Sequence, residues 1–158
     1  MEEEHNYKII SIDSSKSIYS QANTHNFYIN LDEPLRNVYK INIITILADV
    51  PQTASFQSLD TINIRLNDYK RLISKKDGNN LYYFDSIIVE NSISSRTTVK
   101  NDYNTTDNVY YLNPLEPQLS RFELTLYDKN NDVLTTSNIT RFIIKLGVYY
   151  SNKKTTRI

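Results

Sequence analysis

The segment Arg121–Val133, RFELTLYDKNNDV, decides how the rest of the chain is interpreted. Its apolar residues Phe122, Leu124 and Leu126 alternate with polar or amphipathic ones, and a period of two is typical of a β-strand with one buried face. A run of Asp, Lys and Asn follows, and these residues favour turns. The segment therefore predicts a half-buried strand that ends in a turn.

The same alternation recurs along the chain, between polar or proline-containing stretches. We expect strands at Tyr7–Ile12, Asn26–Leu31, Val38–Val50, Thr61–Leu66, Leu81–Val89, Asn108–Asn113, Arg121–Tyr127 and Arg141–Tyr150. The range Asn67–Ser74 fits either a short helix or an irregular connection. The pair Asp77-Gly78 predicts a tight turn. Within Val38–Val50 the apolar residues change parity after Ile43, which indicates a β-bulge or a strand buried on both faces.

About eight strands in 158 residues predict an all-β fold, an antiparallel two-sheet sandwich. A single jelly roll is preferred over an immunoglobulin-like sandwich, because the chain has no Cys or Trp and its strands are unevenly spaced. We expect one domain over residues 1–158, with loose ends at about 1–6 and 151–158. The Ser-, Thr- and Asn-rich stretch Glu90–Asp107 is expected to be a mobile surface loop.

Composition argues against several classes of function. The chain carries 18 basic and 18 acidic residues, so it has no general attraction for nucleic acid. It has no Cys, which excludes disulfides, thiol catalysis and Cys-ligated zinc. No apolar run approaches the ~20 residues of a membrane helix, so membrane insertion is not expected.

The residues that carry chemistry are sparse. His5 and His25 lie far apart in the sequence and form no metal-ligand pair. With 2 Gly in the whole chain, neither a serine-nucleophile turn nor a glycine-rich phosphate loop is present. We therefore expect a protein that is not an enzyme and that carries no cofactor or metal.

Tyrosine is in excess, with 13 copies, and several are adjacent to another aromatic residue. Consecutive residues on a strand point to opposite faces, so one of each pair can enter the core while the other stays outside. Exposed aromatic residues are enriched at protein–protein interfaces, and they also form sugar-binding platforms or simply support neighbouring strands. The residues proposed for an interface are Tyr110, Tyr111, Tyr149 and Tyr150.

Several segments, taken in order, resemble one family of proteins. The segments are Ile12–Lys16 (IDSSK), His25–Leu31 (HNFYINL), Pro34–Ile41 (PLRNVYKI), Ala48–Pro51 (ADVP) and Leu115–Phe122 (LEPQLSRF). Their order resembles that of the single jelly-roll penton and minor capsid proteins of large icosahedral double-stranded DNA viruses. Each segment alone is weak, because it consists of common strand and turn residues, but together they span most of the chain.

This resemblance implies a structural capsid protein, assembled in the host cytoplasm and located in the virion capsid. The preferred role is the penton, in which identical copies form a pentameric ring that also contacts neighbouring capsid proteins. A non-vertex minor capsid (cement) protein is the alternative within that class. A lectin-like carbohydrate-binding attachment module is the alternative from another class.

Overall fold

The structure is a computed structural model that describes residues 6–51, 60–89, 96–101 and 108–151, with the backbone alone described over 96–101. One 3-10 turn, η1 (Ser14–Lys16), follows the first strand. The described strands are β1 (Asn6–Asp13), β2 (Ile18–Tyr19), β3 (Asn26–Val50), β4 (Thr61–Leu66), β5 (Leu72–Lys76), β6 (Asn79–Tyr83), β7 (Asp85–Ile88), β8 (Arg96–Asn101), β9 (Val109–Tyr127) and β10 (Arg141–Tyr150).

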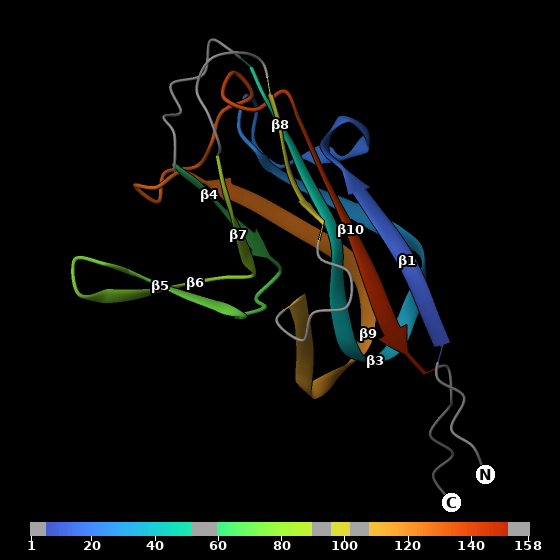
Figure 1. Ribbon diagram of the computed structural model, residues 1–158. Helices are drawn as coiled ribbons and strands as arrows, with labels where there is room; N and C mark the ends of the chain where they lie inside the picture. The colour runs from blue at the N-terminus through green and yellow to red at the C-terminus, as the bar shows by residue number, and fades with distance from the viewer. Residues whose placement is uncertain (1–5, 52–59, 90–95, 102–107, 152–158) are drawn as a thin grey trace, which may run out of the picture.

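These strands form an antiparallel sandwich with the strand order of a jelly roll (Figure 1). One layer runs β1, β10, the C-terminal half of β3, and β8. The other layer runs the N-terminal half of β3, the C-terminal half of β9, β4 and β7. Successive segments of the chain lie in alternate layers, except that β4 and β7 lie in the same layer. This crossing pattern is the arrangement expected from the strand count and spacing.

The core lies between the two layers. Phe27 from one layer meets Phe142 from the other, with ring centroids 6.4 Å apart at 61°. The alternation in Arg121–Tyr127 is confirmed, since Phe122, Leu124 and Leu126 are all fully buried. Other fully buried apolar side chains include Ile12, Ile41, Ile46, Ile62, Ile64, Leu66 and Phe84.

The β-bulge expected in Val38–Val50 is present at Ile44. In the ladder between β3 and β10, Lys145 pairs with Thr45 and Leu146 pairs with Ile43, so Ile44 has no partner. The extra residue shifts the side-chain alternation by one position. It allows Ile43 before the bulge and Ile46 after it both to face the core.

Two predicted strand breaks were wrong. The segments Asn26–Leu31 and Val38–Val50, expected as separate strands, are parts of the continuous strand β3. The segments Asn108–Asn113 and Arg121–Tyr127 belong to the two ends of β9. The prolines are tolerated because the β3–β9 ladder is interrupted where Pro34 and Pro114 lie, and no N–H is needed there. At these interruptions both strands pass from one layer to the other.

The region between β4 and β7 also departs from expectation. Asn67–Ser74 forms no helix, because a turn at Asn67-Asp68 leads through an irregular stretch into β5. The turn at Asp77-Gly78 is confirmed, with φ of 52° and 79°, and it joins β5 to β6 in a hairpin that projects from the sandwich (Figure 1). The single strand expected at Leu81–Val89 is two strands. It breaks at Phe84, whose N–H donates to the Ile64 carbonyl 2.7 Å away.

The loop expected at Glu90–Asp107 contains a strand, β8, which pairs with the C-terminal end of β3. The rest of that loop lies outside the described residues. Of the ends expected to be loose, Asn6 begins β1, and the Ser151 N–H donates to the Arg36 carbonyl at 3.0 Å. The remaining terminal residues lie outside the described part of the chain.

Candidate interaction surface

A row of side chains crosses the outer face of the sandwich on four adjacent strands. Tyr7 of β1 pairs with Tyr149 of β10, which pairs with Lys40 of β3, which pairs with Tyr111 of β9. Directly paired residues project from the same face of a sheet, so these four side chains lie side by side. Together with Tyr39, they form what we call the tyrosine platform.

The platform is held together by contacts between aromatic rings and one cation. The rings of Tyr7 and Tyr149 have centroids 4.8 Å apart at 50°, and Tyr39 approaches Tyr149 at 6.2 Å. The ammonium of Lys40 lies 4.7 Å from the ring centroid of Tyr149 and 5.8 Å from that of Tyr111. Tilted ring pairs and cation–π contacts each stabilise such an arrangement by about 1 kcal/mol. The rings are therefore oriented before any partner binds.

Parts of the platform stay open to solvent. Tyr111 is 66% exposed and Tyr7 is 48% exposed. Ile9, two positions after Tyr7 on the same face of β1, is 59% exposed and extends the apolar area. An exposed aromatic and aliphatic surface of this kind is suited to contact with another molecule.

Two further residues, Gly147 and Asn42, contact the rings of the platform. Gly147 on β10 has no side chain, and the ring of Tyr7 lies over it. Asn42 on β3 donates from Nδ2 to the hydroxyl of Tyr149 at 3.4 Å, and its buried Oδ1 has no hydrogen-bond partner among the described residues. Burial raises the pKa of Tyr7, and the neighbouring Tyr149 raises it further, so the phenol stays neutral at physiological pH.

The residues predicted for an interface divide between two environments. Tyr111 and Tyr149 belong to the platform. Tyr110 and Tyr150 are half-buried and pack against the core, Tyr110 with ring centroids 5.2 Å from Tyr69 and 6.1 Å from Phe84. Sequence reasoning missed Tyr7, Tyr39 and Lys40, because they join the platform only through strand pairing. The one available signal was the aromatic at the start of the first strand.

His25 and the buried carboxylate Asp85 have structural surroundings. His25 is fully buried, with Nε2 2.6 Å from the Ile139 carbonyl, and His5 lies outside the described residues. Asp85 is buried and forms an ion pair with Arg71 at 2.8 Å. Among the residues that the structure describes, no three His, Asp or Glu side chains gather as a metal site would require.

The described residues include no helix long and apolar enough to span a membrane. No protein-family model matches the sequence, and no curated protein matches it at a significant level.

Proposed function

We propose that this protein is a structural subunit of a viral capsid, of the single jelly-roll kind found in large icosahedral double-stranded DNA viruses. The observation that carries the proposal is the strand order, in which two four-segment layers cross as in a jelly roll. The ordered segments that resemble the capsid family support it independently. A penton at the five-fold vertex is the preferred position, and a non-vertex minor capsid protein is the alternative.

A ring of identical subunits needs two different contact surfaces on each copy, because the contact is head to tail. The tyrosine platform is suited to one side of such a contact. Its rings are fixed by their mutual contacts and by Lys40, so little side-chain freedom is lost on association. Tyrosine is also among the residues that most often dominate interface energies.

Native mass spectrometry and electron microscopy of the purified chain test this proposal. We expect pentameric rings that dissociate on dilution. A chain that stays monomeric at high concentration and is absent from virions would contradict the capsid role. A monomer that binds only to preassembled shells would instead identify a minor capsid protein.

A matched pair of variants tests the platform as the contact. Tyr111→Ser should weaken ring formation about tenfold or more, because it removes the most exposed ring of the platform. Tyr82→Ser is the control, since Tyr82 is 43% exposed on the projecting hairpin. Rings that are equally stable in both variants would show that the contact lies elsewhere, and the capsid role itself would still be judged by the ring.

A lectin-like attachment module is the second candidate function, favoured by the solvent-facing ring of Tyr111 beside the Lys40 ammonium. An exposed ring can stack on the apolar face of a sugar. A glycan array should then give binding that is lost in Tyr111→Ala and Tyr149→Ala. A blank array with the unaltered protein would remove this candidate.

A further inference from the structure

A second surface, far from the platform in the strand order, is hollowed beside the β5–β6 hairpin. It consists of two adjoining depressions of about 310 and 690 Å³. Both depressions are lined by Arg65, Asn67, Asp68 and Tyr127, so they form one continuous feature, which we call the Arg65 groove. Volumes of this size are typical of sites for small molecules.

The groove is built from strand alternation and a docked hairpin. Ile64 and Leu66 of β4 are fully buried, so Arg65 between them projects outward. The hairpin forms the facing wall, and its Tyr83 hydroxyl donates to the side-chain oxygen of Asn131 in the turn after β9. Lys76 of the hairpin donates to the carbonyl of Asn130 in the same turn. Two contacts therefore hold the hairpin against the end of β9.

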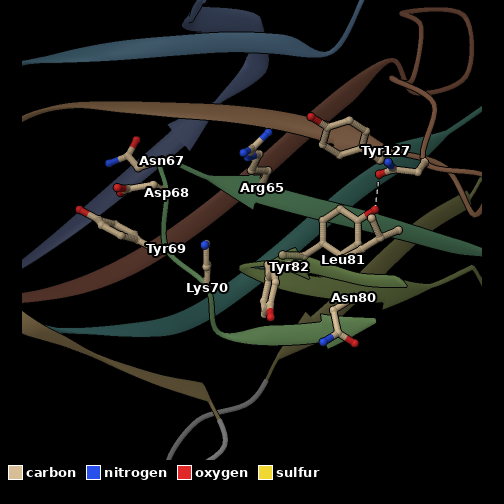
Figure 2. Close-up of a pocket in the computed structure, with 11 residues that line it drawn as sticks. Arg65, Asn67, Asp68, Tyr69, Lys70, Asn80, Leu81, Tyr82 and Tyr127 are labelled. Atoms are coloured by element: carbon tan, nitrogen blue, oxygen red, sulfur yellow. Dashed lines mark hydrogen bonds between the residues drawn. The ribbon is translucent and has the colours of Figure 1, made fainter. Parts of the chain in front are cut away.

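Arg65 differs from most of the arginines around it. Arg71 is paired with Asp85 at 2.8 Å, and Arg121 donates to Glu123 at 3.3 Å. Arg65 makes no hydrogen bond or ion pair with any residue in the described part of the chain, and it is exposed. In Figure 2 its guanidinium lies between Asn67 and Tyr127. All five N–H donors of this guanidinium are available to a ligand.

A second cation lies at the same depression. The ammonium of Lys70 is 5.0 Å from the ring centroid of Tyr82, and both residues line the smaller depression (Figure 2). Asp68 is the one carboxylate among the described residues that line the smaller depression, so with Arg65 and Lys70 these residues carry a net positive charge. The larger depression adds Glu116 and Glu123 against Arg121, so the smaller depression is the part of the groove that favours an anion. Its ligand should therefore be an anion.

The rest of the lining indicates the kind of anion. Amides and hydroxyls of Asn80, Asn131, Gln118, Ser120 and Thr125 line the two depressions, and tyrosine rings provide flat apolar faces. Amide and hydroxyl groups are suited to hydrogen bonds with sugar hydroxyls, and aromatic rings are suited to the apolar face of a sugar. A hydrophobic peptide anchor would need an aliphatic pocket. In the smaller depression Leu81 is the one aliphatic side chain among the lining residues.

We propose that the Arg65 groove binds an acidic saccharide, with its carboxylate or sulfate on the guanidinium of Arg65 and its ring against the tyrosines of the smaller depression. A planar guanidinium matches a carboxylate or sulfate through two parallel hydrogen bonds. The larger depression continues from Arg65 and has room for a further sugar unit, which should be uncharged because Glu116 and Glu123 lie there. This inference does not depend on assembly, and it places the ligand on residues that the platform does not use.

Titration calorimetry with three soluble saccharides tests the proposal. The probes are 3′-sialyllactose for a carboxylate, 3′-sulfated lactose for a sulfate, and lactose as the neutral control. At least one acidic saccharide should bind, and lactose should bind about tenfold more weakly or not at all. Binding of the sialylated probe alone would assign a carboxylate ligand, and binding of the sulfated lactose alone would assign a sulfated one.

Three variants separate recognition from total charge. Arg65→Gln should weaken binding about tenfold or more, because two charge-assisted hydrogen bonds are lost. Arg65→Lys should bind at an intermediate level, because it keeps the positive charge but cannot form the two parallel hydrogen bonds of a guanidinium. Lys145→Gln removes the same charge from β10 in the other layer and should bind like the unaltered protein. Arg65→Gln should unfold at the same denaturant concentration as the unaltered protein, since Arg65 has no hydrogen-bond partner among the described residues to lose.

Three results would overturn the inference. The first is no binding of either acidic saccharide. The second is binding that survives Arg65→Gln. The third is equal displacement of the saccharide by a polyglutamate peptide, which would show that the groove selects negative charge alone. Each is measured on the unaltered chain or on a folded variant, so ring formation can succeed or fail independently.

Discussion

The ring of Tyr7 lies directly over Gly147, its diagonal neighbour on the adjacent strand β10. A Cβ built at position 147 would lie 2.5 Å from the Tyr7 hydroxyl oxygen and 2.9 Å from its Cζ. These separations are too short for any side chain larger than hydrogen. The absence of a side chain at Gly147 therefore allows the Tyr7 ring to lie over β10 and to contact Tyr149 at 4.8 Å.

Gly147→Ala should displace the Tyr7 ring and remove its contact with Tyr149. The ring is the end of a side chain and can move into solvent, so the expected loss in the free energy of unfolding is about 0.5–1.5 kcal/mol, the worth of an aromatic pair. Chemical denaturation measures it. In a Tyr7→Ala background the same change should be neutral or stabilising, because Ala costs less backbone entropy than Gly. An equal loss in both backgrounds would mean that Tyr7 is not the residue in conflict.

The bulge at Ile44 predicts an unusual tolerance to deletion. Removing Ile44 leaves Ile41, Ile43, Ile46, Ala48 and Val50 in strict alternation and brings the Leu146 and Lys145 pairings into one regular ladder. We expect the variant to fold, with a free energy of unfolding lower by about 1–2 kcal/mol, chiefly because the burial of one half-buried side chain is lost. Thermal unfolding and circular dichroism measure the outcome.

Deletion of Leu47 is the matched control, since it removes one residue of similar size from the same strand. It moves Ala48 and Val50 to the outer face and shifts their pairing with β10 and β8. The expected loss is several kcal/mol, enough to prevent folding of many single domains. If the two deletions are equally damaging, the register does not depend on the bulge as we describe.

His25 should make stability fall in mildly acidic solution. Burial lowers the pKa of His25, and its hydrogen bond to the Ile139 carbonyl raises it to a smaller extent. His25 has a pKa near 6.5 in the unfolded chain and a lower pKa in the folded chain, so below pH 6.5 the unfolded chain binds more protons. The free energy of unfolding should therefore be constant above that pH and decrease as the pH falls below it.

Measurements of urea unfolding at a series of pH values from 8 to 5 would show this decrease. In His25→Gln the side-chain amide can still donate to the Ile139 carbonyl but cannot titrate, so the decrease over this range should be smaller. A slope that is unchanged in the variant would assign the pH dependence to other groups.

Asp13 should contribute stability that is lost only in strong acid. Its carboxylate accepts two bonds from Arg141, at 2.5 Å from Nη2 and 3.2 Å from Nε, and two from Ser15. The bonds from Arg141 hold the pKa of Asp13 well below its ordinary value of 3.8. Because the folded pKa is the lower one, the stabilisation is complete above pH 3.8 and decreases as the pH falls toward the folded value.

Asp13→Asn should therefore be less stable than the unaltered protein at pH 7, and the two should converge in strong acid. Unfolding at pH 7 and at pH 2 compares them. The effect at pH 7 should be small for an ion pair, because the Arg141 side chain is 49% exposed and partly screened by water. A constant difference at both pH values would mean that the charge of Asp13 plays no part.

Local pattern was enough to locate most of the strands and the bulge. Phe122, Leu124 and Leu126 alternate because the chain repeats side-chain direction every two residues, and that period is visible without any partner strand. Pattern failed at Pro34 and Pro114. In a sequence, a proline indicates the end of a strand. Both prolines lie where the hydrogen-bond ladder between β3 and β9 is interrupted, so the strands continue past them, and this interruption is visible only when the partner strand is known.

The sequence by itself determined the fold class, the buried face of Arg121–Tyr127, the Asp77-Gly78 turn and the parity change after Ile43, because each depends on residues close together in the chain. Only the tertiary structure decided that Tyr7, Lys40, Tyr111 and Tyr149 share one surface and that Arg65 is exposed beside a docked hairpin. These groupings depend on strand order and register. Both are fixed when the two layers bury their apolar faces against each other, and no short segment contains that information.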